Sequence, residues 1–298
     1  MAQTPTQTPL KPSLLQTLTV LFKWRVVSLL LFGSVAGAFL AAGGFPGWSG
    51  LALVFVTGGL AASGAGAWNQ IIEADKDRTM RRTAQRPLAV GNPFWRKWLP
   101  YLATAMIVVP ILAVLPFNRA LAVWLAMGAI IYVGIYTLWL KPRSLLNIVI
   151  GGAAGSAAVL SGSAAVGNWA DAGAVALALL IFLWTPSHFW SLAIRYKDDY
   201  QNSDTPMLPA RTSPQAAAWW IFLHTAGTVF AAVILSAHAS LGVWYFVPVF
   251  LAGVWYIWRN IRLIQQPTPH MAFELFKVSN YYLAIVLLLI CLVVGLTR

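Results

Sequence analysis

Long apolar runs, each followed by a short polar segment, occupy almost the whole chain. A helix of about 20 mostly apolar residues is long enough to cross the hydrocarbon core of a bilayer. The sequence therefore predicts an all-α, polytopic membrane protein with nine transmembrane helices. The nine apolar runs begin near Val26, Trp48, Leu99, Leu121, Leu146, Ala172, Ala217, Leu241 and Asn280.

The composition excludes a soluble protein. Charged residues make up 9% of the 298 residues, and hydrophobic residues make up 59%. Soluble domains carry about 25% charged residues, so this chain could not cover a water-facing surface. The net charge of +12 would suggest nucleic acid in a soluble protein, but basic residues in a membrane protein report orientation instead. We therefore expect a lipid bilayer around the chain and no nucleic-acid partner.

The basic residues also predict how the chain is oriented. All 20 lysines and arginines except Arg119 and Arg298 fall in the N-terminal segment or after the second, fourth, sixth and eighth runs. Positive charge collects on the cytoplasmic side, so we expect the N-terminus inside and the C-terminus outside. The sequence predicts a flexible tail over residues 1–22 and a single transmembrane domain over residues 23–298. Because the tail lacks an Arg-rich transit peptide, a bacterial inner membrane is favoured.

An acidic cluster follows the second apolar run. Asn69, Glu73 and Asp77 recur every four residues, so a continuing helix would place them on one face. Amide and carboxylate oxygens are hard ligands that suit Mg²⁺. Arg82 and Arg86 come next, and guanidinium groups bind phosphate oxygens in bidentate pairs. The pattern indicates a site for Mg²⁺ and diphosphate on the cytoplasmic side. The alternative interpretation is that these charged residues form a solvated, salt-bridged loop.

A second acidic cluster follows the sixth run. Asp198 and Asp199 are preceded by Arg195 and Lys197. Four spans separate the two clusters, so both would face the cytoplasm, where the carboxylates could complete the metal site and the cations could neutralise a leaving phosphate. His188 stands at the end of the sixth run, where it is either a structural hydrogen-bonding residue or a ligand contact.

Two motifs resemble those of a known enzyme family. Asn69-x-x-x-Glu73-x-Asp75-x-Asp77, with Met80-x-Arg82-Thr83-x-x-Arg86-Pro87-Leu88 after it, resembles the first motif of the intramembrane UbiA-type prenyltransferases. Trp184-Thr185-Pro186-x-His188-Phe189-Trp190, with Asp199-Tyr200 and Pro206-Met207-Leu208-Pro209, is similar to a signature of the branch that farnesylates heme b. Asn147-Ile148-Val149-Ile150-Gly151-Gly152 looks like the fifth span of that branch. The resemblance extends from about Lys23 to the ninth run.

The chain departs from the family pattern at four places. Ser187 stands where a second proline is usual, Ala158-Val159 stands where the family has two prolines, and Lys23-Trp24-Arg25 replaces Lys-Pro-Arg. Glu73 stands where many members carry aspartate, but glutamate keeps the charge and the oxygens. The lost prolines affect local helix geometry more than they affect the chemistry.

The resemblance implies a UbiA-type helical bundle that transfers a farnesyl group from farnesyl diphosphate to a vinyl group of heme b, giving heme O for terminal oxidases. Mg²⁺ would stabilise the leaving diphosphate as a Lewis acid. The implied metal ligands are Asn69, Glu73, Asp77, Asp198 and Asp199, and the implied diphosphate-binding residues are Arg82, Arg86, Arg195 and Lys197. His188 would contact the heme through its iron or a propionate. Asp75 is a second-tier site residue, and so are Arg25 and Lys277, which could meet propionates.

Two other classes compete with this interpretation. An enzyme of the same family that prenylates an aromatic quinone or chlorophyll precursor would use the same metal site and differ only in its acceptor pocket. A transporter would carry acidic residues at mid-membrane depth, whereas six of the eight acidic residues here fall in two loops. The sequence leaves open whether a downstream heme A synthase is a partner.

Overall fold

The computed structural model describes residues 13–80, 83–201 and 205–296. All regular elements of these residues are helical, which confirms the predicted all-α class. Among the described residues, eight helical segments of 19 to 31 residues are long and apolar enough to cross a bilayer. They are α2 (Trp24–Ala42), α3 to α4 (Gly47–Asp77), α5 (Pro93–Val114), α6 with η2 (Arg119–Leu140), α7 with α8 (Asn147–Ala165), α9 (Ala172–Arg195), α12 (Pro214–Leu235) and α14 (Pro269–Leu296).

Three of these spans change their helical geometry along their length. The second span consists of α3 (Gly47–Leu53), the π-helical η1 (Val54–Gly58) and α4 (Gly59–Asp77). The fourth consists of α6 (Arg119–Ala129) and the π-helical η2 (Ile130–Leu140), and the fifth of α7 (Asn147–Gly151) and α8 (Ala153–Ala165). π-helical turns often occur at functional sites, and η2 contributes directly to the cavity described below.

A further long helix, α13 (Gly242–Gln265), has 24 residues and packs against α12 and α14. It is long enough to be a span, but its mean hydropathy is lower than that of the eight segments named above. Tryptophans, tyrosines and two arginines interrupt its aliphatic residues. The start of the last helix also differs from the prediction. α14 begins at Pro269 instead of near Asn280, since the polar residues Glu274 and Lys277 continue the same helix beyond the apolar run.

Among the described residues, the segment before the first span contains a short helix. Residues 14–21 form α1 (Leu14–Leu21), which Ser13 and Gln16 start with a reciprocal capping box. Gln70 of α4 donates from Nε2 to the carbonyls of Val20 and Leu21, at 2.6 and 2.8 Å. These bonds fix the end of α1 against α4, and so they fix the position of Lys23, which follows two residues later and lines the cavity.

Lys23 follows Phe22, the C-cap of α1, and precedes α2 in a left-handed conformation with φ of 52°. This conformation is uncommon for a residue with a side chain, and such residues concentrate at functional sites. The sharp turn directs α2 away from α1 into the bundle, and it aims the Lys23 side chain toward α4.

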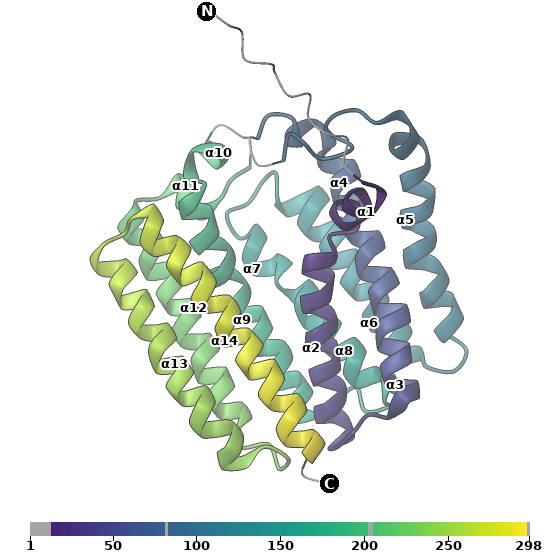
Figure 1. The fold of residues 1–298 in the computed structure, drawn as a ribbon, viewed down its shortest axis with the longest axis vertical. Helices are drawn as coiled ribbons and strands as arrows, with labels where there is room; N and C mark the ends of the chain where they lie inside the picture. The colour runs from purple at the N-terminus through teal and green to yellow at the C-terminus, as the bar shows by residue number, and fades with distance from the viewer. Residues whose placement is uncertain (1–12, 81–82, 202–204, 297–298) are drawn as a thin grey trace, which may run out of the picture.

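A cavity lies among residues of α2, α4, η2, α8, α9 and α14, and Figure 1 shows how the helices are arranged. α12, α13 and α14 lie on one side, and α5 and α6 lie on the other. The last turn of α4, the helix α1 and the short helices α10 (Lys197–Gln201) and α11 (Leu208–Arg211) lie at the same end of the bundle, while α14 ends at the opposite end.

Small residues bring α2 and α8 into close contact on the cavity wall. A Cβ at Gly162 would lie 1.7 Å from the carbonyl oxygen of Ser34, and one at Gly37 would lie 2.5 Å from that of Val159. The hydroxyl of Ser34 donates to the carbonyl of Ala158 at 2.6 Å. Close backbone packing of this kind holds membrane helices together where lipid is as apolar as the side chains.

Candidate active site

A cavity of about 980 Å³ opens between the spans. One part of its wall is polar and comes from the last turns of α4, from η2 and from the segment after α4. The other part is formed by apolar and small side chains of α2, α6, α8 and α9. α2 lines the cavity from Arg25 to Ser34, which corresponds to about 14 Å of helix. The cavity can therefore hold a molecule with a charged head and a long apolar tail.

The polar wall contains the row of residues that the sequence predicted. α4 continues as helix to Asp77, so Asn69, Glu73 and Asp77 lie on one face and all three line the cavity. They are only 1%, 8% and 4% exposed. Two carboxylates and an amide buried side by side require a compensating charge, and the structure supplies cations.

Each member of this row is paired with a basic side chain. Lys23 donates to the amide oxygen of Asn69, and Lys141 forms an ion pair with Glu73. Arg86 NH1 lies 2.8 Å from Asp77 Oδ2. The pairs show that this wall is built to hold opposite charges together, and the same cations could turn to a diphosphate when a metal ion occupies the carboxylates.

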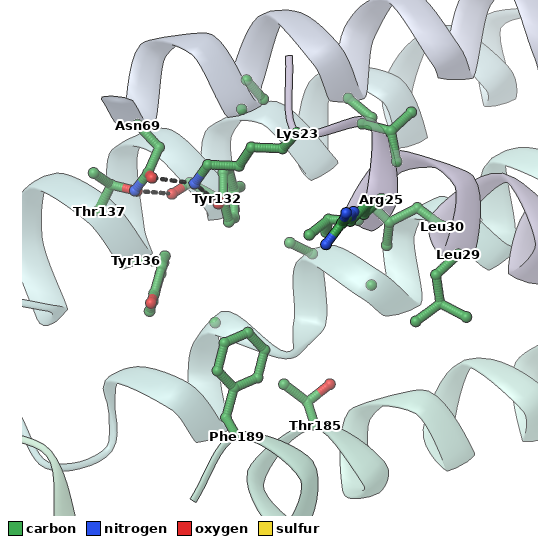
Figure 2. A pocket seen from close by; sticks show the side chains of 18 of the residues that line it. Lys23, Arg25, Leu29, Leu30, Asn69, Tyr132, Tyr136, Thr137, Thr185 and Phe189 are labelled. Atoms are coloured by element: carbon green, nitrogen blue, oxygen red, sulfur yellow. Dashed lines mark hydrogen bonds between the residues drawn. The ribbon is translucent and has the colours of Figure 1, made fainter. Parts of the chain in front are cut away.

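The π-helical η2 fixes the orientation of the amide in this row. Thr137 Oγ1 donates to the carbonyl of Tyr132 at 2.7 Å and accepts from Asn69 Nδ2 at 3.0 Å. Because Nδ2 faces Thr137, the amide oxygen of Asn69 faces Lys23 and the cavity (Figure 2). Tyr132 accepts a hydrogen bond from Lys23 at 3.1 Å and stacks on Tyr136. The oxygen of Asn69 could therefore serve as a metal ligand if Lys23 turned away.

Lys23 and Lys141 line the cavity, and the sequence analysis named neither as a candidate site residue. Each stands at the border of an apolar run, where both contributed to the predicted orientation and Lys23 also marked a departure from the family pattern. A lysine next to a tyrosine-rich run, as Lys141 is to Tyr132-x-x-x-Tyr136, is the signal that could have indicated an inward-facing cation. Lys23 precedes the first span, and burial lowers the pKa of its ammonium group to about 7, although Glu73 acts in the opposite direction.

The second acidic cluster does not line the main cavity. Arg195, Lys197 and Asp198 line a separate depression of about 170 Å³, together with Pro209, Pro214, Pro267 and Pro269. Asp199 is half-buried and belongs to neither wall. In the described ranges, no three histidine, cysteine, aspartate or glutamate side chains converge as a metal-binding group. The structure thus brings the first cluster together, and it places the second at the same end of the bundle but apart from it.

The remaining predicted residues fall in different places. Asp75 is exposed on the outer side of α4 and pairs with Arg78 and Arg96 at 3.7 and 3.4 Å. Lys277 pairs with Glu274 at 2.6 Å and does not line the cavity. Arg82 lies outside the described residues.

Two predicted residues line the cavity away from the acidic row. Arg25, in the first turn of α2, lines it (Figure 2). His188 of α9 is buried at the wall and its ring is held between Trp184 and Phe276, at centroid distances of 4.2 and 4.5 Å. His188 Nδ1 lies 2.9 Å from Ser279 Oγ. Both residues are placed to meet a second ligand beside the polar wall.

The residues of the polar wall fit a magnesium ion. Asn69, Glu73 and Asp77 line the cavity with the oxygen donors that a small, hard cation prefers, and nearby lysine and arginine side chains match the charge of a diphosphate. An oxygen-lined, cation-rich head space joined to an apolar tail space defines an enzyme that handles prenyl diphosphates.

Comparison with known proteins gives the same class. The UbiA prenyltransferase family matches residues 30–286, and the chain belongs to this family. It is 38% identical over 272 residues to a protoheme IX farnesyltransferase of Metallosphaera sedula, covering 91% of this chain and 94% of the relative. It is 39% identical over 280 residues to a protoheme IX farnesyltransferase of Sulfurisphaera tokodaii, covering 92% and 91%.

Solved structures support the fold. A digeranylgeranylglyceryl phosphate synthase structure matches with a TM-score of 0.78 at 16% identity, covering 94% of this chain and 98% of that one. A UbiA homologue from Archaeoglobus fulgidus, solved with DMAPP and Mg²⁺, matches with a TM-score of 0.61 at 15% identity, covering 92% and 98%. These matches confirm the predicted UbiA-type helical bundle.

Proposed function

We propose that this chain transfers a farnesyl group from farnesyl diphosphate to a vinyl group of heme b, and so makes heme O. The observation that carries the proposal is that the buried row Asn69, Glu73 and Asp77 shares one cavity with a long apolar wall. The protoheme IX farnesyltransferases named above cover more than nine-tenths of this chain, which supports heme as the acceptor.

In this proposal, Asn69, Glu73 and Asp77 would hold Mg²⁺, which would supply Lewis-acid stabilisation of the diphosphate. The support is the oxygen geometry of α4 together with the family member solved with DMAPP and Mg²⁺. Lys141 and Arg86, now paired with Glu73 and Asp77, would turn to the phosphate oxygens and stabilise the charge that develops as the allylic C–O bond breaks.

We propose that the second acidic cluster binds a further metal ion. Asp198 and Asp199 would bind it, and Arg195 and Lys197 would neutralise the departing diphosphate. Since these residues line a separate depression or no cavity at all in the structure, this part requires α10 to move toward the end of α4. The prediction for Asp199 in the Discussion tests it.

The apolar part of the cavity would hold the farnesyl chain. Small residues on α6 and α8, among them Gly128, Gly155 and Ala158, line this space. An allylic cation is quenched by bulk water, so an apolar wall around the reacting carbons protects it. Arg25 and His188 line the same cavity and would contact the heme, Arg25 through a propionate.

We further propose that α13 is a ninth span and that the acidic row faces the cytoplasm. α13 is as long as α9 and packs between α12 and α14, and the basic residues follow alternate spans. The chain would then have its N-terminus inside and its C-terminus outside a cell membrane. The sequence favours a bacterial inner membrane, although the relatives named above are archaeal.

The proposal is tested by the mass of the product. Protein in detergent or nanodiscs is incubated with farnesyl diphosphate, Mg²⁺ and heme b, and a parallel reaction contains 4-hydroxybenzoate instead of heme. We expect a heme heavier by one farnesyl group and one hydroxyl group, and no prenylated benzoate. Prenylated 4-hydroxybenzoate with unmodified heme would contradict the acceptor assignment and favour a quinone-precursor enzyme.

A further inference from the structure

Buried polar side chains extend behind His188 into the bundle of α9, α12, α13 and α14. Ser187 on α9 and Tyr256 on α13 are hydrogen bonded at 2.8 Å, and Tyr256 also interacts with the hydroxyls of Thr225 and Ser279. Ser279 in turn contacts His188 Nδ1 at 2.9 Å. All of these side chains except His188 are fully buried or nearly so. A connected set of hydroxyls therefore reaches from the bundle interior to the cavity wall.

The same bundle holds buried polar atoms without a hydrogen-bond partner among the described residues. They include Trp190 Nε1 on α9, His224 Nδ1 on α12, Tyr245 OH and Asn260 Oδ1 on α13, and Tyr282 OH on α14. Buried polar atoms are almost always satisfied, and where no protein group does so an ordered water usually does. We infer that this bundle contains internal water next to the hydroxyls behind His188.

The hydrogen bonds of Ser279 also assign the tautomer of His188. Ser279 Oγ donates to the carbonyl of Phe276 at 2.7 Å. Its oxygen is then the acceptor for Nδ1–H of His188, so Nε2 carries a lone pair. No described residue hydrogen bonds to Nε2, and His188 lines the cavity. Trp184 and Phe276 hold the ring on both faces, which leaves its Nε2 edge as the reactive one.

The proposed reaction needs one base at such a position. The C–O bond to diphosphate breaks, and a C–C bond forms between the farnesyl terminal carbon and the outer vinyl carbon of heme. The positive charge then lies on the inner vinyl carbon, where the oxygen of a water molecule adds and one proton must leave. Glu73 and Asp77 are paired with Lys141 and Arg86, whereas Nε2 of His188 has no hydrogen-bond partner among the described residues.

We propose that His188 Nε2 accepts this proton as the water adds, and that Ser279 and Tyr256 position His188 and connect it to the internal water that supplies the step. The inference rests on the proposed function and deepens it, because it assigns the hydration half of the reaction to α9 and α14. Prenyl transfer itself takes place at the acidic row of α4.

The test separates hydration from prenyl transfer by the mass of the heme product. His188→Ala and Ser279→Ala are compared with wild type in the presence of farnesyl diphosphate, heme b and Mg²⁺, and diphosphate release is measured in parallel. Loss of a general base slows its step by about 100-fold or more. In both variants we expect the hydrated fraction to fall and a farnesylated heme lacking the water to accumulate, because the cation then loses a proton from carbon.

Matched variants control for packing. Ser279→Thr keeps the hydroxyl and should restore the hydrated product. Thr228→Val removes another fully buried hydroxyl of the same bundle, one that donates to its own helix at His224, and should leave the product ratio unchanged. If His188→Ala makes no heme product at all, Ser279→Ala alone decides, and an unchanged hydrated fraction in that variant would overturn the inference.

Two other outcomes are distinguishable. A wild-type hydrated fraction in His188→Ala overturns the role as base. A role as iron ligand would also overturn it. In that case His188→Ala would change the heme absorption spectrum, and added imidazole would restore the hydrated product only when it also restored the spectrum. If wild-type protein yields no farnesylated heme, the proposed function fails instead.

Discussion

Replacing Asp77 with asparagine tests the acidic row with the smallest change in shape. The side chain keeps its size but loses its charge and one strong metal-ligating oxygen. Asp77 is buried on the cavity wall and its carboxylate lies 2.8 Å from Arg86. If it holds the metal that stabilises the leaving group, its loss should slow farnesyl transfer by about 100-fold or more, which equals about 2.7 kcal/mol of transition-state stabilisation.

The same substitution should have a much smaller effect on folding. Arg86 keeps 23% of its side chain exposed, so it can turn toward water once its partner is neutral. Its separation from Asp77 should therefore cost about 1 kcal/mol, near the upper limit for exposed pairs and well below the 3–5 kcal/mol typical of a fully buried pair. Thermal unfolding in detergent should show a modest shift, while expression stays at the wild-type level.

Asp75 supplies the matched control. It lies two residues away on the same helix, but its side chain is 82% exposed and pairs with Arg78 and Arg96 outside the cavity. Asp75→Asn makes the same change in charge and should leave the rate of farnesyl transfer within about twofold of wild type, since it removes only exposed ion pairs. Wild-type turnover in Asp77→Asn, or an equal loss in both variants, would refute the metal-ligand assignment.

Three further predictions follow from the same geometry. EDTA should stop the reaction and Mg²⁺ should restore it, because the oxygen donors of α4 suit a hard cation; product formation in metal-free buffer would contradict this. Lys141→Met should lower kcat about 10-fold or more through lost stabilisation of the diphosphate. Lys277→Met should not, because the ammonium group of Lys277 pairs with Glu274 away from the cavity; equal rates in the two variants would remove Lys141 from the site. Asp199→Asn should slow transfer if α10 moves to bring a second metal ion to α4, and a wild-type rate would restrict the metal site to Asn69, Glu73 and Asp77.

The parts of the site that depend on local spacing were predictable from sequence. Asn69, Glu73 and Asp77 share a face because α4 continues as regular helix to Asp77, and helical periodicity alone determines that relation. The apolar runs likewise predicted the spans, since each needs only its own composition. α13 is the exception in hydropathy, because its tryptophans and tyrosines replace the aliphatic residues that define the other spans.

The parts that depend on how helices meet were not predictable in the same way. Lys23 is 46 residues from Asn69, with the first span and most of the second between them, and Lys141 is separated from Glu73 by two whole spans. Only the packed bundle brings the two lysines to Asn69 and Glu73. Asp198 and Lys197 show the converse. Their charges suggest the same site as Asp77, but which way the short helix α10 turns is set by tertiary contacts, and in the structure they line a separate depression.

An experimental structure of the protein with Mg²⁺ and a non-reactive farnesyl diphosphate analogue would test the central claim most directly. We predict a metal ion about 2.1 Å from oxygens of Asn69, Glu73 or Asp77, with the diphosphate beside Lys141 and Arg86 and the farnesyl chain along α2 and α8. A diphosphate bound instead at the depression formed by Arg195 and Lys197, with the acidic row still paired to its lysines and arginine, would contradict it.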